Sequence, residues 1–523
     1  MVFILFSVLS SLLLLLSFPK FSLEYIAWIA LVPLFLALIR KGVYKGFLLS
    51  LFCGVLFWSG LAYWLMNVPR YTLLHYVILM PYLGSFFGLF GGFFCFIANR
   101  RGATTAALAA PFLWVALDFI RAHFFWLALP WGMLGHSQYE TLPVIQIAAY
   151  TGAYGVTFLI AAVNAALFLL ILAFFPSHFS GVMIPSKSAA VKGIVLAVCC
   201  LTVSLVYGRM ILSLPIQGDK VKISVIQASI PQHKKWEKGF AKTIMKTYTD
   251  LTRAAAEDRP DLIAWPETAT PAAINLDRRV YKQVARIAHQ TGIPLLLGSA
   301  QRRKYEDENI KGLNYTNSAF LIDPKIRAKP QRYDKIHLLP FGEYLPTKDI
   351  IPWHLIGVTP IRGYTPGKAY TVMNLGPHRL GVPICWENIF PYITRGFVKN
   401  GAQFIVNITN AAYFGRTAAP YQVLSMTVFR AVENRVYVAR AANIGISCII
   451  DIHGRVLDRV RDADGQDVFV PGYLTGTVIP QDEKTFYTRF GDVFAWICSV
   501  AAILFVMMAF LPNNRQTAAC KSR

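Results

Sequence analysis

The sequence predicts two structural parts: a polytopic α-helical membrane domain with about eight transmembrane helices, and an α/β domain between the seventh and eighth of them. Hydrophobic residues make up 55% of the 523-residue chain and charged residues 15%, against roughly 25% charged residues in ordinary soluble domains. The first 212 residues alternate apolar runs with short polar breaks, whereas residues 219–480 have the composition of a soluble domain. Part of the chain is therefore predicted to lie in lipid.

Eight apolar runs approach the ~20 residues that a helix needs to cross a bilayer. Seven precede the polar segment and one follows it: residues 2–19, 24–39, 46–66, 74–98, 104–123, 153–175, 193–213 and 490–511. The first run lacks the basic start and the small-residue cleavage site of a signal peptide, so we expect a retained helix.

The formal net charge of +23 is typical of basic loops on the cytoplasmic side of a membrane. No basic helix or basic–aromatic stripe suggests a nucleic-acid site. With a cytoplasmic N-terminus, three basic residues lie in outside connections (Lys20, Arg70, Arg121), and ten lie inside: Arg40, Lys41, Lys45, Arg100, Arg101, Lys187, Lys192, Arg515, Lys521 and Arg523. This bias predicts a bacterial inner-membrane protein whose large polar domain is periplasmic. The expected boundaries are 1–213 (seven helices), 214–488 (polar domain), 489–511 (eighth helix) and 512–523 (cytoplasmic tail).

The polar domain alternates β-branched apolar runs with helix-like stretches, which is typical of an α/β fold. The predicted strands are Val221–Ala228, Leu262–Trp265, Pro294–Gly298, Ser318–Ile322, Arg379–Ile384, Phe404–Ile408, Tyr437–Ala441 and Ser447–Asp451. The predicted helices include Phe240–Ala256, Arg278–Thr291 and Pro420–Asn434.

Cys385 is the candidate nucleophile. It follows the apolar run Gly381-Val382-Pro383-Ile384 and precedes the polar turn Trp386-Glu387-Asn388. A thiol at the end of a strand, with the amides of a following helix pointing at it, would be favoured as the reactive thiolate. The alternative is a buried structural cysteine, which is the usual role of a single Cys.

Two further stretches carry matching chemistry. Trp265-Pro266-Glu267-Thr268 ends one strand, and Glu267 could act as a base for the thiol if burial raised its pKa. The stretch YDKIHLLPFGEY contains Lys335, whose ammonium could stabilise an oxyanion, and Glu343, which could orient that lysine or relay a proton. Taken singly, each of these residues also fits an ordinary solvated surface position.

The order Glu, Lys, Cys in the contexts WPE, YDKIHLLPFGEY and PICWEN resembles the nitrilase superfamily of carbon–nitrogen hydrolases. With its membrane spans, the loop LPWGMLGHSQ, the arm IPQHKKW and the segment AANIGISCIIDIHGRV, nearly the whole chain is similar to the apolipoprotein N-acyltransferase family. The resemblance implies an αββα sandwich with a Glu267–Lys335–Cys385 triad. It also implies supporting roles for Glu343, Trp386 and Glu387, and substrate contacts at Trp236, Tyr344 and Tyr413.

The activity that this resemblance implies is a two-step acyl transfer. Cys385 would take an acyl chain from a membrane phospholipid as a thioester, and the α-amine of the N-terminal diacylglyceryl-cysteine of an apolipoprotein would then accept it. The expected partners are these two substrates and the bilayer, with no nucleic acid, no cofactor and no metal, and the chain is expected to act as a monomer. The alternatives are a membrane-anchored amidase that passes the acyl group to water, and a membrane scaffold without catalytic activity.

Two departures from the family pattern affect only the expected substrate contacts. Tyr413 stands where the pattern has tryptophan, and Trp386 replaces a more common tyrosine. The loop Leu129–Gln138 has two open interpretations, an interfacial aromatic belt or a roof over a lipid-facing site. Cys448 matches no motif and is predicted to be a core residue.

Overall fold

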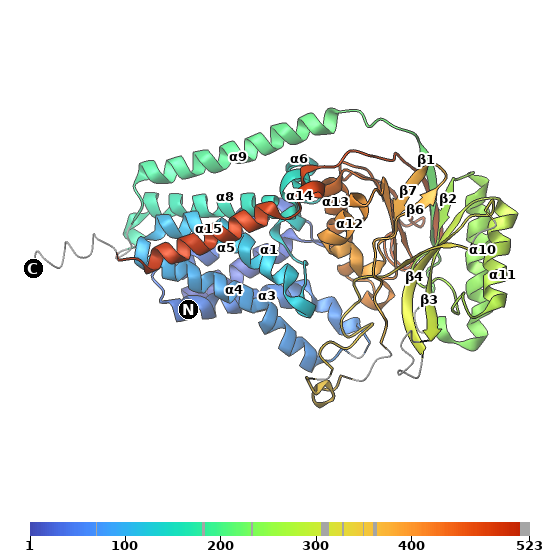
Figure 1. The fold of residues 1–523 in the computed structure, drawn as a ribbon. Coiled ribbons are helices and arrows are strands. Elements are labelled where there is room, and N and C mark those ends of the chain that lie inside the picture. Colours follow the sequence, from blue (N-terminus) through green and yellow to red (C-terminus); the bar gives the residue numbers. More distant parts are fainter. Residues whose placement is uncertain are drawn as a thin grey trace, which may run out of the picture. The chain divides into compact units, whose positions relative to one another are not determined.

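The computed structural model describes residues 1–69, 71–179, 184–231, 234–304, 313–326, 329–348, 350–358 and 363–512. They form two compact units (Figure 1). The first is helical and comprises Met1–Met66, Tyr71–Ser213 and the residues from Asp492 onward. The second is an α/β unit that consists mainly of Leu214–Gly491. The predicted tail at 513–523 lies outside the described residues.

The helical unit contains six helices that are long and apolar enough to cross a membrane, within the part of the chain that the structure describes. They match six of the eight predicted spans: α3 (Val43–Leu61), α4 (Leu73–Arg101), α5 (Ala103–His123), α8 (Ala153–Phe174), α9 (Lys187–Ser213) and α15 (Val493–Phe510). Shorter helical segments connect them: η2 (Tyr63–Asn67), η3 (Phe125–Leu127), η4 (Leu134–Gln138), α6 (Leu142–Ile145), α7 (Ala148–Thr151) and η5 (Pro176–Phe179).

The first two predicted spans are shorter or broken. Helix α1 (Val2–Ser17) has 16 residues, or about 24 Å, and the second span is divided into η1 (Glu24–Trp28) and α2 (Val32–Leu38). The buried side chain of Asn164 satisfies the backbone at this break, accepting from Leu31 N at 2.8 Å and donating to Ala27 O at 3.0 Å. An interrupted helix is tolerated in an apolar environment when its free backbone groups are paired in this way. That these two segments cross the bilayer stays a prediction.

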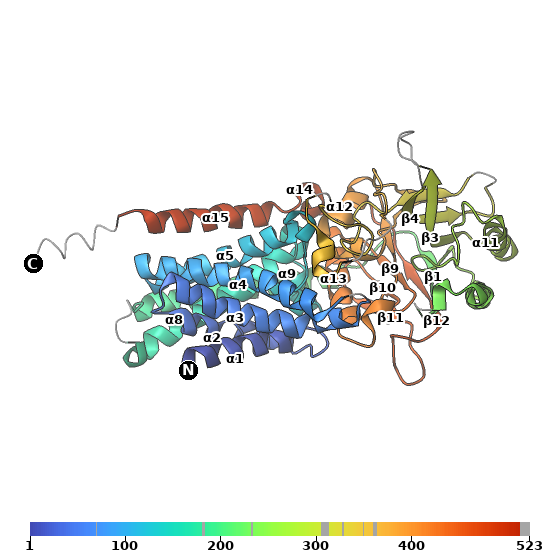
Figure 2. The ribbon, with the colours of Figure 1, turned by 90° about the horizontal axis from the view of Figure 1, so that it is seen from below.

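Close packing in the helical unit depends on small residues where α3 and α4 approach each other. A Cβ atom on Gly91 would lie 2.0 Å from Ser50 Oγ, and one on Gly84 would lie 2.8 Å from a Val55 methyl group. Such contacts are typical of helix pairs in membranes, where dispersion rather than water exclusion drives association. Helix α15 packs against α4 and α5 (Figure 2), and Arg101 donates to Met508 O near its end.

The loop Leu129–Gln138 is part of the interior of the helical unit. Arg121, which is paired with Asp118 at 2.7 Å, donates to Leu129 O and Trp131 O. Trp131 is 2% exposed, so it does not face lipid as a residue of an interfacial belt would. The belt interpretation is therefore wrong for this residue, and the roof over a lipid-facing site stays a prediction.

The α/β unit contains two six-stranded sheets. The first has the order β12-β1-β2-β3-β4-β5 and the second β11-β10-β9-β8-β7-β6. Parallel pairs join β1, β2 and β3 in one sheet and β7, β8 and β9 in the other. The strands are β1 (Val221–Gln227), β2 (Leu262–Ala264), β3 (Leu295–Lys304), β4 (Leu313–Ile322), β5 (Gln331–Asp334), β6 (Met373–Leu375), β7 (His378–Gly381), β8 (Phe404–Thr409), β9 (Val438–Ala442), β10 (Cys448–Ile450), β11 (Val456–Arg459) and β12 (Gly472–Val478).

Helices cover the outer faces of both sheets, which confirms the predicted αββα sandwich. Helices α10 (Ala241–Glu257) and α11 (Arg278–Thr291) lie outside the first sheet, and α12 (Pro391–Lys399) and α13 (Ala419–Asn434) outside the second (Figures 1 and 2). Short helical segments complete the unit: η6 (Lys234–Trp236), η7 (Lys238–Phe240), η8 (Trp353–Ile356), η9 (Cys385–Ile389), η10 (Ala412–Phe414) and α14 (Phe486–Phe490).

The eight predicted strands all correspond to observed ones, but four strands were not predicted. Strands β5, β6 and β11 have three or four residues each, too few to show a clear period in sequence. The predicted strand Arg379–Ile384 is shorter in the structure, since β7 ends at Gly381. Cys448 is fully buried, which confirms it as a core residue.

Candidate active site

The first sheet supplies a carboxylate and an ammonium to the same place. Glu267 lies three residues beyond β2, and Lys335 directly follows β5, where its backbone N–H donates to Asn317 O at 2.8 Å. Both side chains are buried, Glu267 with 7% and Lys335 with 2% of its surface exposed. Lys335 Nζ lies 3.8 Å from Glu267 Oε1. The two sequence motifs therefore meet in one buried site.

Glu343 is the closer partner of the lysine. Its carboxylate oxygens lie 2.9 and 3.0 Å from Lys335 Nζ, and it also accepts from Leu339 N at 2.7 Å. Burial alone would lower the pKa of Lys335, but the charges of Glu343 and Glu267 together raise it well above its ordinary value. Lys335 is therefore a permanent cation in this site.

Asn317, which the sequence analysis did not select, bridges the two carboxylates. Its side-chain nitrogen donates to Glu267 Oε1 at 2.7 Å and to Glu343 Oε1 at 2.9 Å. It lies on β4, which pairs with β5, the strand directly before Lys335. No sequence motif marks an Asn within a strand. Its place in the site becomes visible only when β4 pairs with β5.

The second sheet supplies the thiol. Cys385 begins η9 with φ at +52°, a left-handed conformation that is uncommon for a residue with a side chain and that is often found at functional positions. Thr409 and the backbone N–H of Asn410, at the end of β8, hydrogen-bond with the sulfur. The candidate nucleophile is thus held by hydrogen bonds from the end of β8.

The expectation that helix amides favour the thiolate is wrong for this state of the site. Cys385 opens a short 3-10 turn, and the next α-helix begins only at Pro391. Burial and the charge of Glu267 raise the pKa of the Cys385 thiol to about 12, although Lys335 and the hydrogen bonds from Thr409 and Asn410 oppose this. The resting group is a thiol, and it needs a base in order to react.

Glu387 connects the two halves of the site. One carboxylate oxygen accepts from Tyr333 Oη at 2.7 Å, Ile336 N at 2.7 Å and His337 N at 3.0 Å, and the other accepts from Ile384 N at 2.7 Å. It thus ties the loop after Lys335 to the residue before Cys385. Burial raises the pKa of Glu387 to about 7, and these hydrogen bonds limit the rise. These contacts fit the supporting role expected for Glu387.

Lys235 is a second buried cation that the sequence analysis missed. Only 4% of its surface is exposed, and it interacts with the charges of Glu267 and Cys385. Burial lowers the pKa of Lys235 to about 8, and the Glu267 carboxylate and the thiolate form of Cys385 oppose this change. Lys235 belongs to the arm IPQHKKW, which the sequence analysis did note. In sequence, however, nothing distinguishes Lys235 from its exposed neighbour Lys234.

The segment before Lys235 is tied to the strand end beside Cys385. Asn443 accepts from Ile230 N and donates to Ile230 O, each at 2.9 Å, and it donates to Asn410 Oδ1 at 3.2 Å. Because Asn410 also binds the sulfur through its backbone, one hydrogen-bonded chain links the arm to Cys385. None of these asparagines was predicted.

The aromatic residues expected near the substrate make fewer contacts with the site than the charged residues do. The Trp386 ring lies 5.9 Å from that of Phe390, Tyr413 is 40% exposed in η10, and Tyr344 is partly buried on the loop that follows Lys335. The side chain of Trp236 lies outside the described part of the structure. Substrate binding by Trp236, Tyr344 and Tyr413 and a supporting role of Trp386 stay predictions.

Together these groups suit nucleophilic acyl transfer. A thiol that is protonated at rest has a buried carboxylate and a fixed ammonium beside it, as an acyl-enzyme mechanism requires. Among the residues that the structure describes, no cluster of side chains has the composition of a metal site.

Two known families match separate parts of the chain. Residues 10–166 match the family described as Apolipoprotein N-acyltransferase N-terminal domain, and residues 222–471 match Carbon-nitrogen hydrolase. The first match falls almost entirely in the helical unit, and the second spans the strands of both sheets except β12.

Curated relatives resemble the chain over nearly its full length. The apolipoprotein N-acyltransferase of Geobacter metallireducens is 38% identical over 514 residues, which cover 97% of this chain and 95% of the relative. That of Chlorobaculum tepidum is 30% identical over 533 residues, covering 96% and 95%. Among solved structures, an amidase from Nesterenkonia sp. is 19% identical, with a TM-score of 0.37, and the match covers 53% of this chain and 95% of the amidase.

Proposed function

This chain belongs to the apolipoprotein N-acyltransferase family, and from that membership and the site we propose the reaction in detail. The enzyme moves an acyl chain from a membrane phospholipid to Cys385, and then to the α-amine of the N-terminal diacylglyceryl-cysteine of an apolipoprotein. The observation that carries this proposal is the grouping of Cys385, Glu267 and Lys335 in one buried site of a chain with six helices of membrane-spanning length.

In the first step, the sulfur of Cys385 attacks the ester carbonyl carbon of the phospholipid. Because the pKa of this thiol is raised to about 12, its proton has to leave as the S–C bond forms, and Glu267 accepts it. Lys335 stabilises the negative charge that develops on the carbonyl oxygen. When the C–O bond breaks, Glu267 returns the proton to the leaving oxygen, and a lysophospholipid departs from the thioester.

In the second step, the lipoprotein amine attacks the thioester carbonyl carbon. Glu267 takes a proton from the nitrogen, Lys335 again holds the oxyanion, and the C–S bond breaks. The proton passes to the sulfur, which restores the thiol and leaves an amide on the lipoprotein. The two substrates therefore use one site in turn, and ping-pong kinetics are expected.

Glu343, Asn317 and Glu387 maintain the geometry of both steps. Glu343 holds Lys335 at 2.9 Å, and Asn317 holds both carboxylates. Glu387 keeps the loop after Lys335 against the turn that carries the nucleophile. Small displacements of such groups reduce the rate strongly, because catalysis depends on near-attack geometry.

The substrates explain why this chemistry is joined to apolar helices. Acyl chains leave a bilayer at a cost of ~0.8 kcal/mol per CH₂ group, so both lipids are better reached from within the membrane. We place the enzyme in the bacterial inner membrane, with the α/β unit on the periplasmic side, because basic residues are concentrated in the loops assigned to the cytoplasm. It acts as a monomer in this scheme.

The test uses the purified full-length chain in mixed micelles with phospholipid and a diacylated lipopeptide. We expect a triacylated lipopeptide and one lysophospholipid per product, detected by mass spectrometry, and neither with the Cys385→Ala protein. Release of free fatty acid without triacylated peptide would instead identify a hydrolase. Triacylation that persisted in Cys385→Ala would assign the chemistry to another residue.

A further inference from the structure

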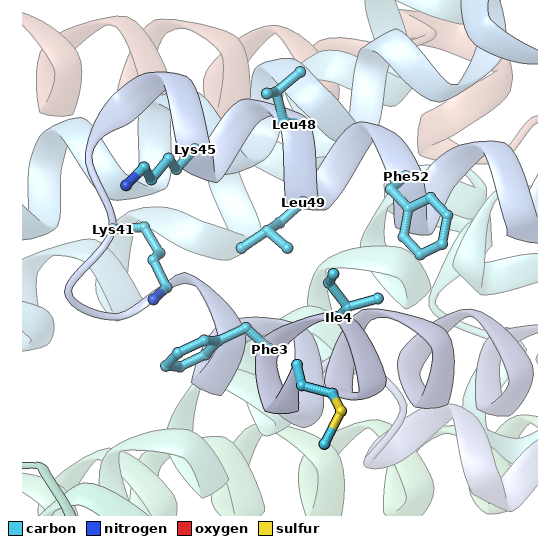
Figure 3. A pocket seen from close by; sticks show the side chains of 8 residues that line it. Phe3, Ile4, Lys41, Lys45, Leu48, Leu49 and Phe52 are labelled. Carbon is cyan, nitrogen blue, oxygen red and sulfur yellow. The ribbon is translucent and has the colours of Figure 1, made fainter.

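A groove in the helical unit lies between the start of α1 and the first three turns of α3. None of the residues that line it has a role in the proposed acyl transfer. It encloses about 450 Å³ and is lined by Met1, Phe3, Ile4, Lys41, Lys45, Leu48, Leu49 and Phe52 (Figure 3). This volume is typical of ligand sites, which span ~300–1,000 Å³.

Charge is concentrated at one end of the groove. Lys41, in the connection before α3, and Lys45, in its first turn, lie at the same end (Figure 3), with Arg40 next to them in sequence. Lys41 Nζ lies 3.3 Å from the centroid of the Phe3 ring. Among the ion pairs of the described residues, none joins these three cations to an acidic side chain.

These cations repel one another. Partial burial, together with the positive charges of Lys45 and Arg40, lowers the pKa of Lys41. An anion placed between the two ammonium groups would relieve this repulsion. The groove therefore favours a negatively charged ligand at this end.

The rest of the groove is apolar. Lys45, Leu49 and Phe52 follow one another at helical spacing on one face of α3, and Figure 3 shows Ile4 of α1 opposite them. Phe3, Ile4 and Phe52 are 37–51% exposed, a degree of exposure that suits contact with hydrocarbon rather than with water. A cationic end that continues into an apolar channel matches a molecule with an anionic head and a hydrocarbon chain.

We infer that this groove binds one anionic phospholipid, with its phosphate between Lys41 and Lys45 and one acyl chain along Ile4, Leu49 and Phe52. Lys and Arg next to membrane helices select anionic headgroups in this way. A zwitterionic lipid is a poorer ligand, because its own cation meets the two lysines. Under the proposed orientation, these lysines face the cytoplasmic leaflet.

This lipid is not the acyl donor of the proposed reaction. Under the proposed orientation, Lys41 and Lys45 face the cytoplasmic leaflet, whereas the unit that carries Glu267, Lys335 and Cys385 is periplasmic. Occupation of the groove would join α1 to α3 and thereby stabilise the N-terminal helix. The inference requires a membrane setting and does not require acyl transfer.

The experiment uses the full-length Cys385→Ala protein, so that no lipid is consumed. Dioleoylphosphatidylglycerol and dioleoylphosphatidylcholine are titrated into the detergent-solubilised protein, and bound lipid is counted by native mass spectrometry. We expect one phosphatidylglycerol to bind roughly tenfold or more tightly than phosphatidylcholine, since each lysine contributes to attraction of the anion. The double variant Lys41→Gln/Lys45→Gln should bind both lipids equally weakly.

Matched variants separate charge, shape and folding. Lys192→Gln, an exposed lysine of α9 outside the groove, should keep the preference for phosphatidylglycerol, as should the charge-preserving Lys41→Arg/Lys45→Arg. Leu49→Trp, which fills the channel but keeps both lysines, should weaken binding. Phosphatidylglycerol should raise the melting temperature most in the variants that bind it most tightly. The melting curve also shows whether each variant is folded.

Three outcomes would overturn the inference. The first is an undiminished preference for phosphatidylglycerol in Lys41→Gln/Lys45→Gln. The second is an equal loss in Lys192→Gln, which would indicate unspecific attraction. The third is full competition by glycerol phosphate, which would show a site for the anion alone. Because the measurement counts bound lipid and not acyl transfer, failure of the acyl-transfer proposal would leave this test unaffected.

Discussion

Lys335 Nζ lies 2.9 Å from Glu343 Oε2 but 3.8 Å from the nearest oxygen of Glu267. The lysine is therefore hydrogen-bonded mainly to the supporting carboxylate, and Glu267 is less strongly engaged with it. The unequal distances fit the proposed roles, in which Glu343 fixes the lysine and Glu267 takes the thiol proton.

Removal of the sulfur should abolish the acyl-enzyme. Purified wild-type protein incubated with phospholipid should gain the mass of one acyl chain, and hydroxylamine should remove it. Cys385→Ala should gain none. Cys448→Ala is the matched control, because Cys448 is buried in the core, and it should acylate normally. Acylation of Cys385→Ala would contradict the assignment of the nucleophile.

Glu267→Gln and Glu343→Gln should differ in degree. Loss of a general base costs typically 10²–10⁴-fold in rate, so Glu267→Gln should slow thioester formation by that amount. Glu343→Gln keeps the base and weakens only the hold on Lys335, so a smaller loss of about 10- to 100-fold is expected. Single-turnover acylation measures both, and equal losses would sink the division of roles.

Lys235 should influence the pH dependence of acylation. Because its pKa is about 8, Lys235 is mostly charged near pH 7 and mostly neutral near pH 10, so Lys235→Met should slow Cys385 alkylation near pH 7 and change it little near pH 10. Lys235→Arg keeps the charge and should restore the profile. Iodoacetamide labelling between pH 7 and 10 provides the measurement. A slower reaction with an unshifted profile would indicate a purely structural role.

Protonation of His337 should lower the free energy of unfolding as the pH falls. Burial and the nearby Lys335 lower the pKa of His337 to about 4 from an ordinary value of 6.5, and its Nδ1 atom lies 2.7 Å from Tyr392 Oη. Because the folded protein binds this proton less readily than the unfolded chain does, the stabilising contribution is complete above pH 6.5. It is lost as the pH falls toward 4, by at most about 3 kcal/mol.

The His337→Gln protein lacks this titration. Its unfolding free energy should therefore decline less steeply than that of the wild type between pH 6.5 and 4. Denaturant unfolding followed by tryptophan fluorescence at several pH values compares the two proteins. Parallel pH curves would show that His337 is not the group responsible.

Much of the architecture followed from local patterns. Six runs of apolar residues became helices of spanning length because only a helix satisfies its own backbone in hydrocarbon. The interruption at Ile29–Leu31 could not be predicted, since it is stabilised by Asn164, more than 130 residues away. Strand β5, which positions Lys335, has only four residues and depends on pairing with β4 for its existence.

For the active site, the resemblance of three motifs to a known family predicted Glu267, Lys335 and Cys385 as a triad, and the structure brings these side chains into one site. Their catalytic roles stay predictions. Their protonation and spacing required the folded chain. The pKa of the Cys385 thiol is high because the sulfur is buried beside Glu267, and Asn317 and Lys235 join the site only through strand pairing and burial. Sequence records which groups are present, whereas distance and dielectric environment, which govern electrostatic energies, arise only when segments far apart in the chain pack together.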